Sequence, residues 1–194
     1  RGLCVVALAT VVAACSGPSK PVPKDLAANI GLIGVKTAWT AQVGPFDGGV
    51  QANVVGAQVL LASANGTVTA LQGETGLVAW QLDVGAPLVS GVGGDGQTFA
   101  AVSESGELIA LTSGKVLWRQ RLGALSLTTP LVAGARIFTL SADRTVTAFD
   151  AASGQRIWQL QRSSDPLVLD QAGVLIAVGD TLVVGVAGRL LGLN

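Results

Sequence analysis

The chain has 194 residues, of which 49% are hydrophobic and 12% charged, and its 26 glycines suit many short strands and turns rather than a disordered chain. Its 12 basic residues balance its 12 acidic residues, so no basic surface is available for nucleic acid. It has no histidine and two cysteines, so we expect no zinc or copper site, no histidine-based triad and no catalytic residues.

The first 14 residues have the form of a secretory signal peptide. Arg1 precedes an apolar run over residues 2–14 that ends in small residues. This run is shorter than the about 20 residues that span a bilayer as a helix, and its lack of periodicity argues against a buried strand or helix. A basic start, an apolar core and small final residues are typical of a signal peptide. Because no initiator methionine is present, we expect the start of the signal to be missing.

The end of this signal, Val12-Ala-Ala-Cys15-Ser16, resembles the bacterial lipobox, in which an aliphatic residue and two small residues precede a lipid-modified cysteine. The resemblance implies lipidation of Cys15, and Ser16 in place of Asp implies sorting to the outer membrane. Residues 15–36 would then contain the lipidated cysteine and a tether. Three prolines between Ser16 and Lys24 indicate that the tether is extended.

From residue 37 the chain repeats one phrase: a strand, a turn that contains glycine, and a second strand that ends on tryptophan. The tryptophans are Trp39, Trp80, Trp118 and Trp158, and a further copy of the phrase begins at Arg189. Their period of about 40 residues lies in the range of propeller blades. We predict three complete four-stranded blades, with strands over 52–55, 58–63, 67–72 and 77–83, then 88–92, 98–103, 107–112 and 115–121, then 131–133, 136–141, 145–150 and 155–161.

The sequence Pro-Leu-Val occurs at Pro87, Pro130 and Pro166, where we expect a blade to open. Proline is tolerated at the first residue of a strand, where no ladder hydrogen bond is lost. Residues 37–194 are therefore predicted to form an all-β propeller of antiparallel four-stranded blades.

The four tryptophans could form a ligand platform or a packing device. Recurrence at one repeat position favours packing, because a binding site is used once whereas a packing contact is used in every blade. We expect each indole between adjacent blades, over the glycine of the preceding turn, with its N–H on a backbone carbonyl. The glycines concerned are Gly76, Gly114 and Gly154.

The segments Ala70–Trp80 and Ala148–Trp158 resemble the pyrroloquinoline-quinone-type propeller repeat, and Ala110–Trp118 is two residues shorter in its turn. Behind a lipobox and a short tether, these repeats resemble the BamB family of outer-membrane-protein assembly lipoproteins. Members of that family close an eight-bladed ring. The resemblance therefore implies an incomplete arc of about three and three-quarter blades, truncated at the C-terminus, with an orphan outer strand at Trp39.

The resemblance also implies a function. It predicts a non-enzymatic scaffold subunit of the outer membrane β-barrel assembly machinery, without a cofactor, anchored to the outer membrane by its lipid and facing the periplasm. The implied partners are the BamA-like barrel insertase and nascent outer membrane proteins. The alternative is a quinone-dependent dehydrogenase, which shares the repeat. Such enzymes typically have a vicinal disulfide and a calcium-binding group of acids and amides, and neither is visible in this sequence.

A candidate partner-binding motif lies after Trp158. In the family, a loop between blades carries an L-x-L-R stretch that docks on BamA, and Leu167 and Leu169 match its leucines. Asp170 stands where the family has Arg, and Arg162 could supply the missing charge. The alternative is that both leucines face the core in the opening strand of the fourth blade, as the repeated Pro-Leu-Val indicates. The sequence leaves both interpretations open.

Overall fold

The structure is a computed structural model that describes residues 34–45, 52–161, 173–186 and 188–194. The chain divides into two units, Arg1–Lys36 and Thr37–Asn194. Of the first unit the described part is residues 34–36, which form no regular element. Within the described part of the chain, no helix is long and apolar enough to cross a membrane.

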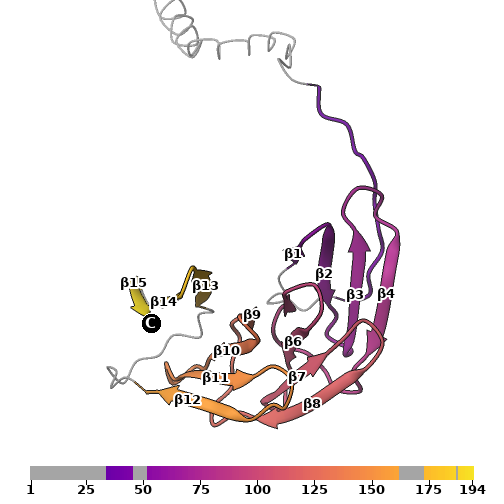
Figure 1. Cartoon of the computed structure of the whole chain (residues 1–194). Coiled ribbons are helices and arrows are strands. Elements are labelled where there is room, and N and C mark those ends of the chain that lie inside the picture. The colour runs from indigo at the N-terminus through magenta and orange to yellow at the C-terminus, as the bar shows by residue number, and fades with distance from the viewer. Residues whose placement is uncertain (1–33, 46–51, 162–172, 187) are drawn as a thin grey trace, which may run out of the picture. The chain divides into compact units, whose positions relative to one another are not determined.

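The second unit contains four antiparallel sheets whose strands are hydrogen-bonded in chain order (Figure 1). Blade 1 comprises β1 (Asn53–Val55), β2 (Gln58–Ala62), β3 (Thr67–Gln72) and β4 (Val78–Asp83). Blade 2 comprises β5 (Gly93–Gly94), β6 (Phe99–Val102), β7 (Glu107–Leu111) and β8 (Val116–Arg121). Blade 3 comprises β9 (Leu131–Ala133), β10 (Arg136–Leu140), β11 (Val146–Asp150) and β12 (Arg156–Leu160). Blade 4 comprises β13 (Val174–Val178), β14 (Thr181–Val186) and β15 (Arg189–Leu193).

The apolar core lies at the boundaries between consecutive blades. Alternate residues of one strand point to opposite faces, and in β6 this places Phe99 in the cluster shared with blade 1 and Ala100 in the cluster shared with blade 3. A third cluster joins Phe138 of blade 3 to Leu182 of blade 4. Both faces of the middle strands are therefore buried, which explains their nearly continuous apolar sequences. Each blade is stabilised mainly by its neighbours, as in other repeat proteins.

The repeat places a buried alanine directly opposite each outer-strand tryptophan. The pairs are Ala70 with Trp80, Ala110 with Trp118, and Ala148 with Trp158. In all three blades the register shifts immediately after the alanine. Such an irregularity bends the strand and increases its local twist. The bend in each blade therefore lies between the repeat alanine and the Leu or Phe that follows it.

The predicted all-β propeller of four-stranded antiparallel blades is confirmed, and most of the strands agree with the predicted ranges to within one residue at each end. The prediction of a strand over residues 88–92 was wrong. Leu88 forms an isolated bridge with Ser103, and the strand that pairs with β6 is Gly93–Gly94. At this position the hydroxyl of Ser90 accepts the amide of Val102 at 2.8 Å in place of a main-chain carbonyl.

The expected outer strand at Trp39 was predicted to lack partner strands, and among the described residues no strand ladder includes it. Residues 37–45 are assigned to no strand. Their main chain nevertheless accepts two hydrogen bonds from blade 1. The hydroxyl of Ser63 donates to the carbonyl of Val43 at 2.8 Å, and the amide of Ala64 donates to the carbonyl of Pro45 at 3.2 Å. The corresponding amides of Glu104 and Ala142 bond to the segments that enter blades 2 and 3. Residues 37–45 thus make the contact of a blade-to-blade connection without a strand ladder.

Candidate functional site

Two tryptophans each cover a glycine in the turn between the last two strands of the following blade. The indole N–H of Trp39 donates to the carbonyl of Gly73 at 2.9 Å, and a Cβ on Gly76 would lie 2.4 Å from the Trp39 ring. In blade 3 the same contact joins Trp118 to Ala151, at 2.9 Å, and to Gly154. We expected Trp118 to cover Gly114, in the turn just before it. It covers Gly154, in the turn of the next blade. Each of these indoles extends from one outer segment onto the turn of the following blade.

The boundary of blades 1 and 2 is built differently. The shorter turn of blade 2 leaves nothing within 4 Å of the position that a Cβ on Gly114 would take. Trp80 instead packs on Phe99 of blade 2, with ring centroids 4.9 Å apart. Trp158 packs on Phe138 of its own blade, at 6.0 Å. Tilted aromatic pairs at such distances add specific attraction to the area they bury.

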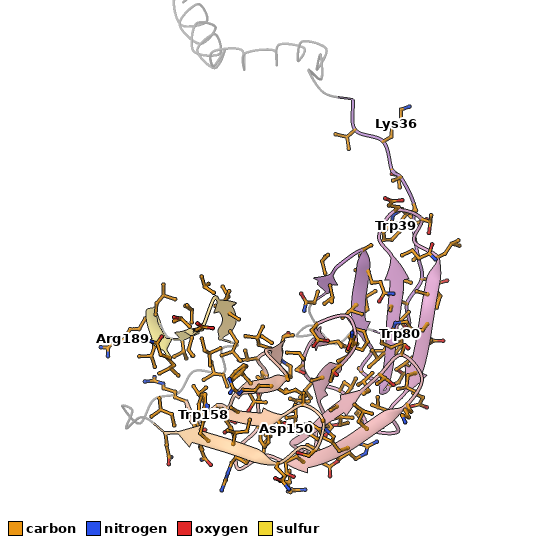
Figure 2. The ribbon with its side chains drawn as sticks, in the orientation of Figure 1. Lys36, Trp39, Trp80, Asp150, Trp158 and Arg189 are labelled. Atoms are coloured by element: carbon orange, nitrogen blue, oxygen red, sulfur yellow. The ribbon has the colours of Figure 1, made fainter. Side chains whose placement is uncertain are left out.

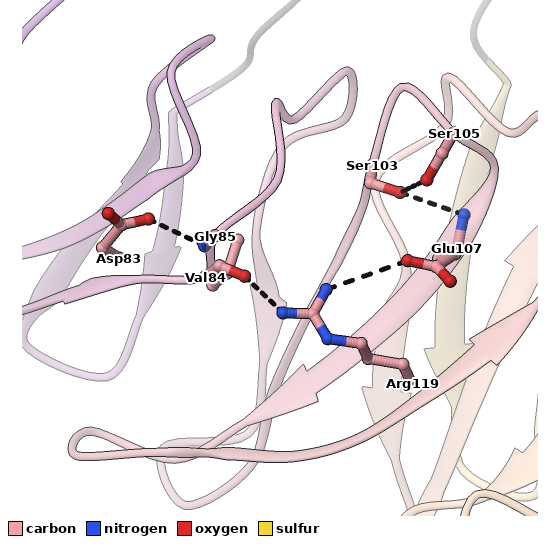
Figure 3. A network of polar contacts seen from close by, with 7 residues as sticks. All are labelled: Asp83, Val84, Gly85, Ser103, Ser105, Glu107 and Arg119. Carbon is pink, nitrogen blue, oxygen red and sulfur yellow. Dashed lines mark hydrogen bonds and ion pairs between the residues drawn. The ribbon is translucent and has the colours of Figure 1, made fainter.

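A polar network ties blade 2 to the end of blade 1 (Figure 3). Arg119 on β8 donates to the carbonyl of Val84, which follows β4, and its guanidinium lies 3.8 Å from the carboxylate of Glu107. The amide of Glu107 in turn donates to the hydroxyl of Ser103 at 3.1 Å. About a third of both ion-pair side chains is exposed, so the pair itself contributes at most about 1 kcal/mol. The ion pair lies within blade 2, and the contact with blade 1 is the hydrogen bond from Arg119 to the carbonyl of Val84.

The sequence interpretation missed this network, although a signal for it was present. Arg119 occupies the repeat position that holds Gln81 in blade 1 and Gln159 in blade 3, as the strand registers show. Glu107 likewise replaces a threonine of the other two blades. Two simultaneous departures of opposite charge, on paired strands, indicate an ion pair once the repeats are aligned by structure.

The candidate partner-binding residues Leu167 and Leu169 lie outside the described residues, as does the candidate lipidation site Cys15. The described residues on either side of the two leucines belong to consecutive blades. β12 ends at Leu160, and β13 begins at Val174 and pairs with β14 over its whole length. In the sequence the two leucines lie between these two strands.

Gly173 marks the entry into blade 4. Its amide donates to the hydroxyl of Thr128 at 2.9 Å. A Cβ at this position would lie 2.4 Å from Leu140 and 2.7 Å from the carbonyl of Gly185, so only glycine fits. Gly173 therefore packs against Leu140 of blade 3 and bonds to the segment that precedes β9.

Metal-ligating side chains do not cluster in the described part of the chain. No group of three or more His, Cys, Asp or Glu side chains lies close enough there to hold a metal ion. The carboxylate of Asp150 (Figure 2) accepts hydrogen bonds from the hydroxyl and the amide of Ser153, both at 2.7 Å. The hydroxyl is the main reason that the pKa of Asp150 falls below its usual value. This carboxylate is exposed and braces the turn between β11 and β12.

The comparisons with known proteins agree with this architecture. The family model described as outer membrane protein assembly factor BamB matches residues 64–194. The chain is 33% identical to BamB of Bordetella pertussis over 175 residues, which cover 89% of this chain and 45% of that protein. It is 32% identical to BamB of Burkholderia pseudomallei over 192 residues, covering 95% and 50%.

A solved structure extends the comparison to the fold. The crystal structure of BamB from Moraxella catarrhalis superposes with a TM-score of 0.65 and 25% sequence identity, over 77% of this chain and 46% of that one. The chain therefore spans about half the length of the relatives that it matches.

Proposed function

The chain belongs to the BamB family of outer membrane protein assembly factors, and from this premise we propose that it is a non-enzymatic scaffold subunit of the outer membrane β-barrel assembly machinery. Its lipid, on Cys15, anchors it to the outer membrane with the propeller facing the periplasm. Leu167 and Leu169 bind the BamA-like insertase. Nascent outer membrane proteins are its second class of partner.

One observation carries the insertase contact. The opening-strand position of blade 4 is held by β13, which begins at Val174. This supports the assignment of Leu167 and Leu169 to a connecting loop rather than to the core of the opening strand. Leucines in an exposed loop would form an apolar patch that calls for a partner. Gly173 and the end of β12 would hold the two ends of that loop on the propeller.

Sheet edges support the contact with nascent proteins. The outer strands β4, β8 and β12 each end a sheet, and among the described strands none pairs with their outer edges. A strand edge offers unpaired N–H and C=O groups to which an extended chain can add. An unfolded β-barrel precursor consists largely of such segments, so these edges suit transient contact with it.

Co-purification tests the proposal. The intact protein, expressed in a bacterial host with an outer membrane, should sediment with that membrane and capture the BamA-like insertase from a detergent extract. Titration of the same protein with pyrroloquinoline quinone should give no saturable binding. Recovery of the protein without the insertase would contradict the scaffold role, and quinone-dependent oxidation of an alcohol or sugar would favour the dehydrogenase alternative.

A further inference from the structure

A polar cavity of about 400 Å³ lies at the boundary between blades 2 and 3. From blade 2 and the segment that follows it, Arg121 and Leu122 contribute to the lining. From blade 3, the lining includes Asp143, Thr145, Arg156 and Gln159. We call this space the inter-blade cavity. Every residue around it is described by the structure.

The cavity occupies the place that the Arg119–Glu107 network fills one blade earlier. Thr145 corresponds to Glu107, because the carbonyl of each accepts the amide of a hairpin serine, at 3.0 Å from Ser141 and 2.9 Å from Ser103. Gln159 corresponds to Arg119 by strand register. Gln159 pairs with Thr147, two residues after Thr145, and Arg119 pairs with Ile109, two residues after Glu107. Both replacements are shorter side chains. Glu107 and Arg119 form their ion pair on paired strands of blade 2, and Arg119 also donates to Val84 at the end of blade 1. The corresponding Thr145 and Gln159 of blade 3 carry no charge, and a polar space lies beside them.

Positive charge around the cavity exceeds negative charge. Arg121 and Arg156 each bring a guanidinium group, and Asp143 brings one carboxylate, which accepts the amide of Thr145 at 3.1 Å. Across the described residues the only ion pair is Arg119–Glu107, so neither arginine is paired with a carboxylate of the described chain. Arg156 donates to the amide oxygen of Gln159 at 2.8 Å. The ionisable lining therefore carries a net charge of about +1 at neutral pH.

A buried hydroxyl at the same place lacks a partner among the described residues. Thr145 is 4% exposed, and its side-chain oxygen makes no hydrogen bond with that part of the chain. An unsatisfied buried polar group is uncommon in folded proteins and calls for an explanation. Arg144 next to it has a φ of +62°, where the equivalent Gly106 has +79°. A side chain in this left-handed region is strained, and such strain concentrates at functional positions.

We propose that the inter-blade cavity binds a carboxylate that carries a short apolar stem, such as the side chain of glutamate. Guanidinium groups match a carboxylate by paired N–H donors. A single negative charge balances the lining, whereas a phosphate dianion would leave an excess of negative charge beside Asp143. Phe149 and Leu122, which also line the cavity, offer apolar contact to methylene groups. The carboxylate comes from a free organic acid or from an acidic residue of an extended peptide.

Calorimetric titration of the intact protein tests this proposal with four probes. These are succinate, inorganic phosphate, a capped pentapeptide with a central Glu and the same pentapeptide with Gln. Saturable binding of succinate or the Glu peptide, at least tenfold tighter than binding of the Gln peptide or phosphate, is the expected result. Succinate alone would identify a free acid as the ligand, and the Glu peptide alone would identify a polypeptide. Equal binding of the Glu and Gln peptides, preference for phosphate, or no saturation at millimolar concentration would overturn the proposal.

Two variants locate the binding. The double substitution Arg121→Gln and Arg156→Gln changes only exposed side chains, so the fold should persist while affinity falls at least tenfold. The double substitution Thr145→Glu and Gln159→Arg copies the blade 2 ion pair into the cavity and should abolish binding. The matched control is Glu107→Thr with Arg119→Gln, which removes the pair at the other boundary and should leave affinity unchanged. Binding that survives in the Arg121 and Arg156 variant would contradict the assignment even if the filled variant failed to fold.

Discussion

Trp118 lies against Gly154 so closely that a Cβ on the glycine would approach the indole ring to 2.7 Å. Gly154 has a φ of +72°, which glycine adopts without strain. The indole N–H also donates to the carbonyl of Ala151 at 2.9 Å. Because the two residues belong to consecutive blades, this contact sets the position of one blade on the next, and Trp39 with Gly76 repeats it.

Gly154→Ala should therefore destabilise the propeller, whereas Gly114→Ala should not. At Gly154 a side chain costs about 1–2 kcal/mol for the left-handed conformation, and overlap with the indole adds to that cost. Gly114 has no such φ, and a Cβ placed there would meet nothing within 4 Å. Chemical unfolding of both variants checks this difference. Similar losses at the two positions would show that the indole contact does not determine stability.

Gly93→Ala should be more disruptive than Gly123→Ala. A Cβ on Gly93 would lie 1.7 Å from the carbonyl oxygen of Pro130. An alanine would therefore force β5 and the start of blade 3 apart. A Cβ on Gly123 would meet nothing within 4 Å, so this glycine serves as the control. We expect a loss of stability in the upper range for single substitutions, about 3 kcal/mol or more, measured by thermal or denaturant unfolding. A Gly93→Ala protein as stable as Gly123→Ala would refute the close approach.

The turn between β11 and β12 should make stability depend on pH under acidic conditions. Hydrogen bonds from Ser153 lower the pKa of Asp150 in the folded protein. A carboxyl group whose pKa is lowered by folding contributes stability above its unfolded pKa, near 3.9, and this contribution is lost as the pH falls through the folded value.

Ser153→Ala removes the main cause of this lowered pKa and provides the test. Below about pH 4, Ser153→Ala should lose less stability than the parent protein as the pH falls. Denaturant midpoints between about pH 2 and 6 measure this change. Identical pH profiles for the two proteins would contradict the role of the serine hydroxyl.

Lipidation of Cys15 is expected from the lipobox resemblance. Mass spectrometry of the protein from a bacterial host should identify a diacylglyceryl cysteine at position 15 as the first residue of the mature chain. Cys15→Ala should release the protein from the membrane without changing its melting temperature, because residue 15 precedes the propeller. A mature chain that begins elsewhere would remove the basis of the membrane assignment.

The sequence predicted the parts of the fold that depend on local pattern. Thr67–Gln72 was predicted to the residue, because turn residues bound this short segment on both sides. Residues 88–92 misled the interpretation because their apolar pattern resembles a strand, while the Ser90 hydroxyl takes the place of a ladder carbonyl. That hydrogen bond is a tertiary contact, which the periodicity of the sequence does not encode.

The contacts between blades were harder to predict. The packing of Trp118 on the turn of the next blade depends on how the blades are rotated against one another, and the sequence pattern placed that indole on the wrong glycine. The inter-blade cavity lies where Thr145 and Gln159 take the places of Glu107 and Arg119, and this correspondence follows from strand pairing rather than from the apolar pattern. The predictions for Cys15, Leu167 and Leu169 remain predictions, since these residues lie outside the described part of the chain.

The scaffold proposal is tested most directly by changing Leu167 and Leu169 together to Asp in the intact protein. Capture of the BamA-like insertase and the melting temperature are then measured on the same preparation. If the leucines are interface anchors in the connection between blades 3 and 4, capture should fall by about 2 kcal/mol or more of binding free energy while the melting temperature stays unchanged. Loss of stability together with capture would place both leucines in the core, and full capture by a stable variant would show that they do not bind the insertase.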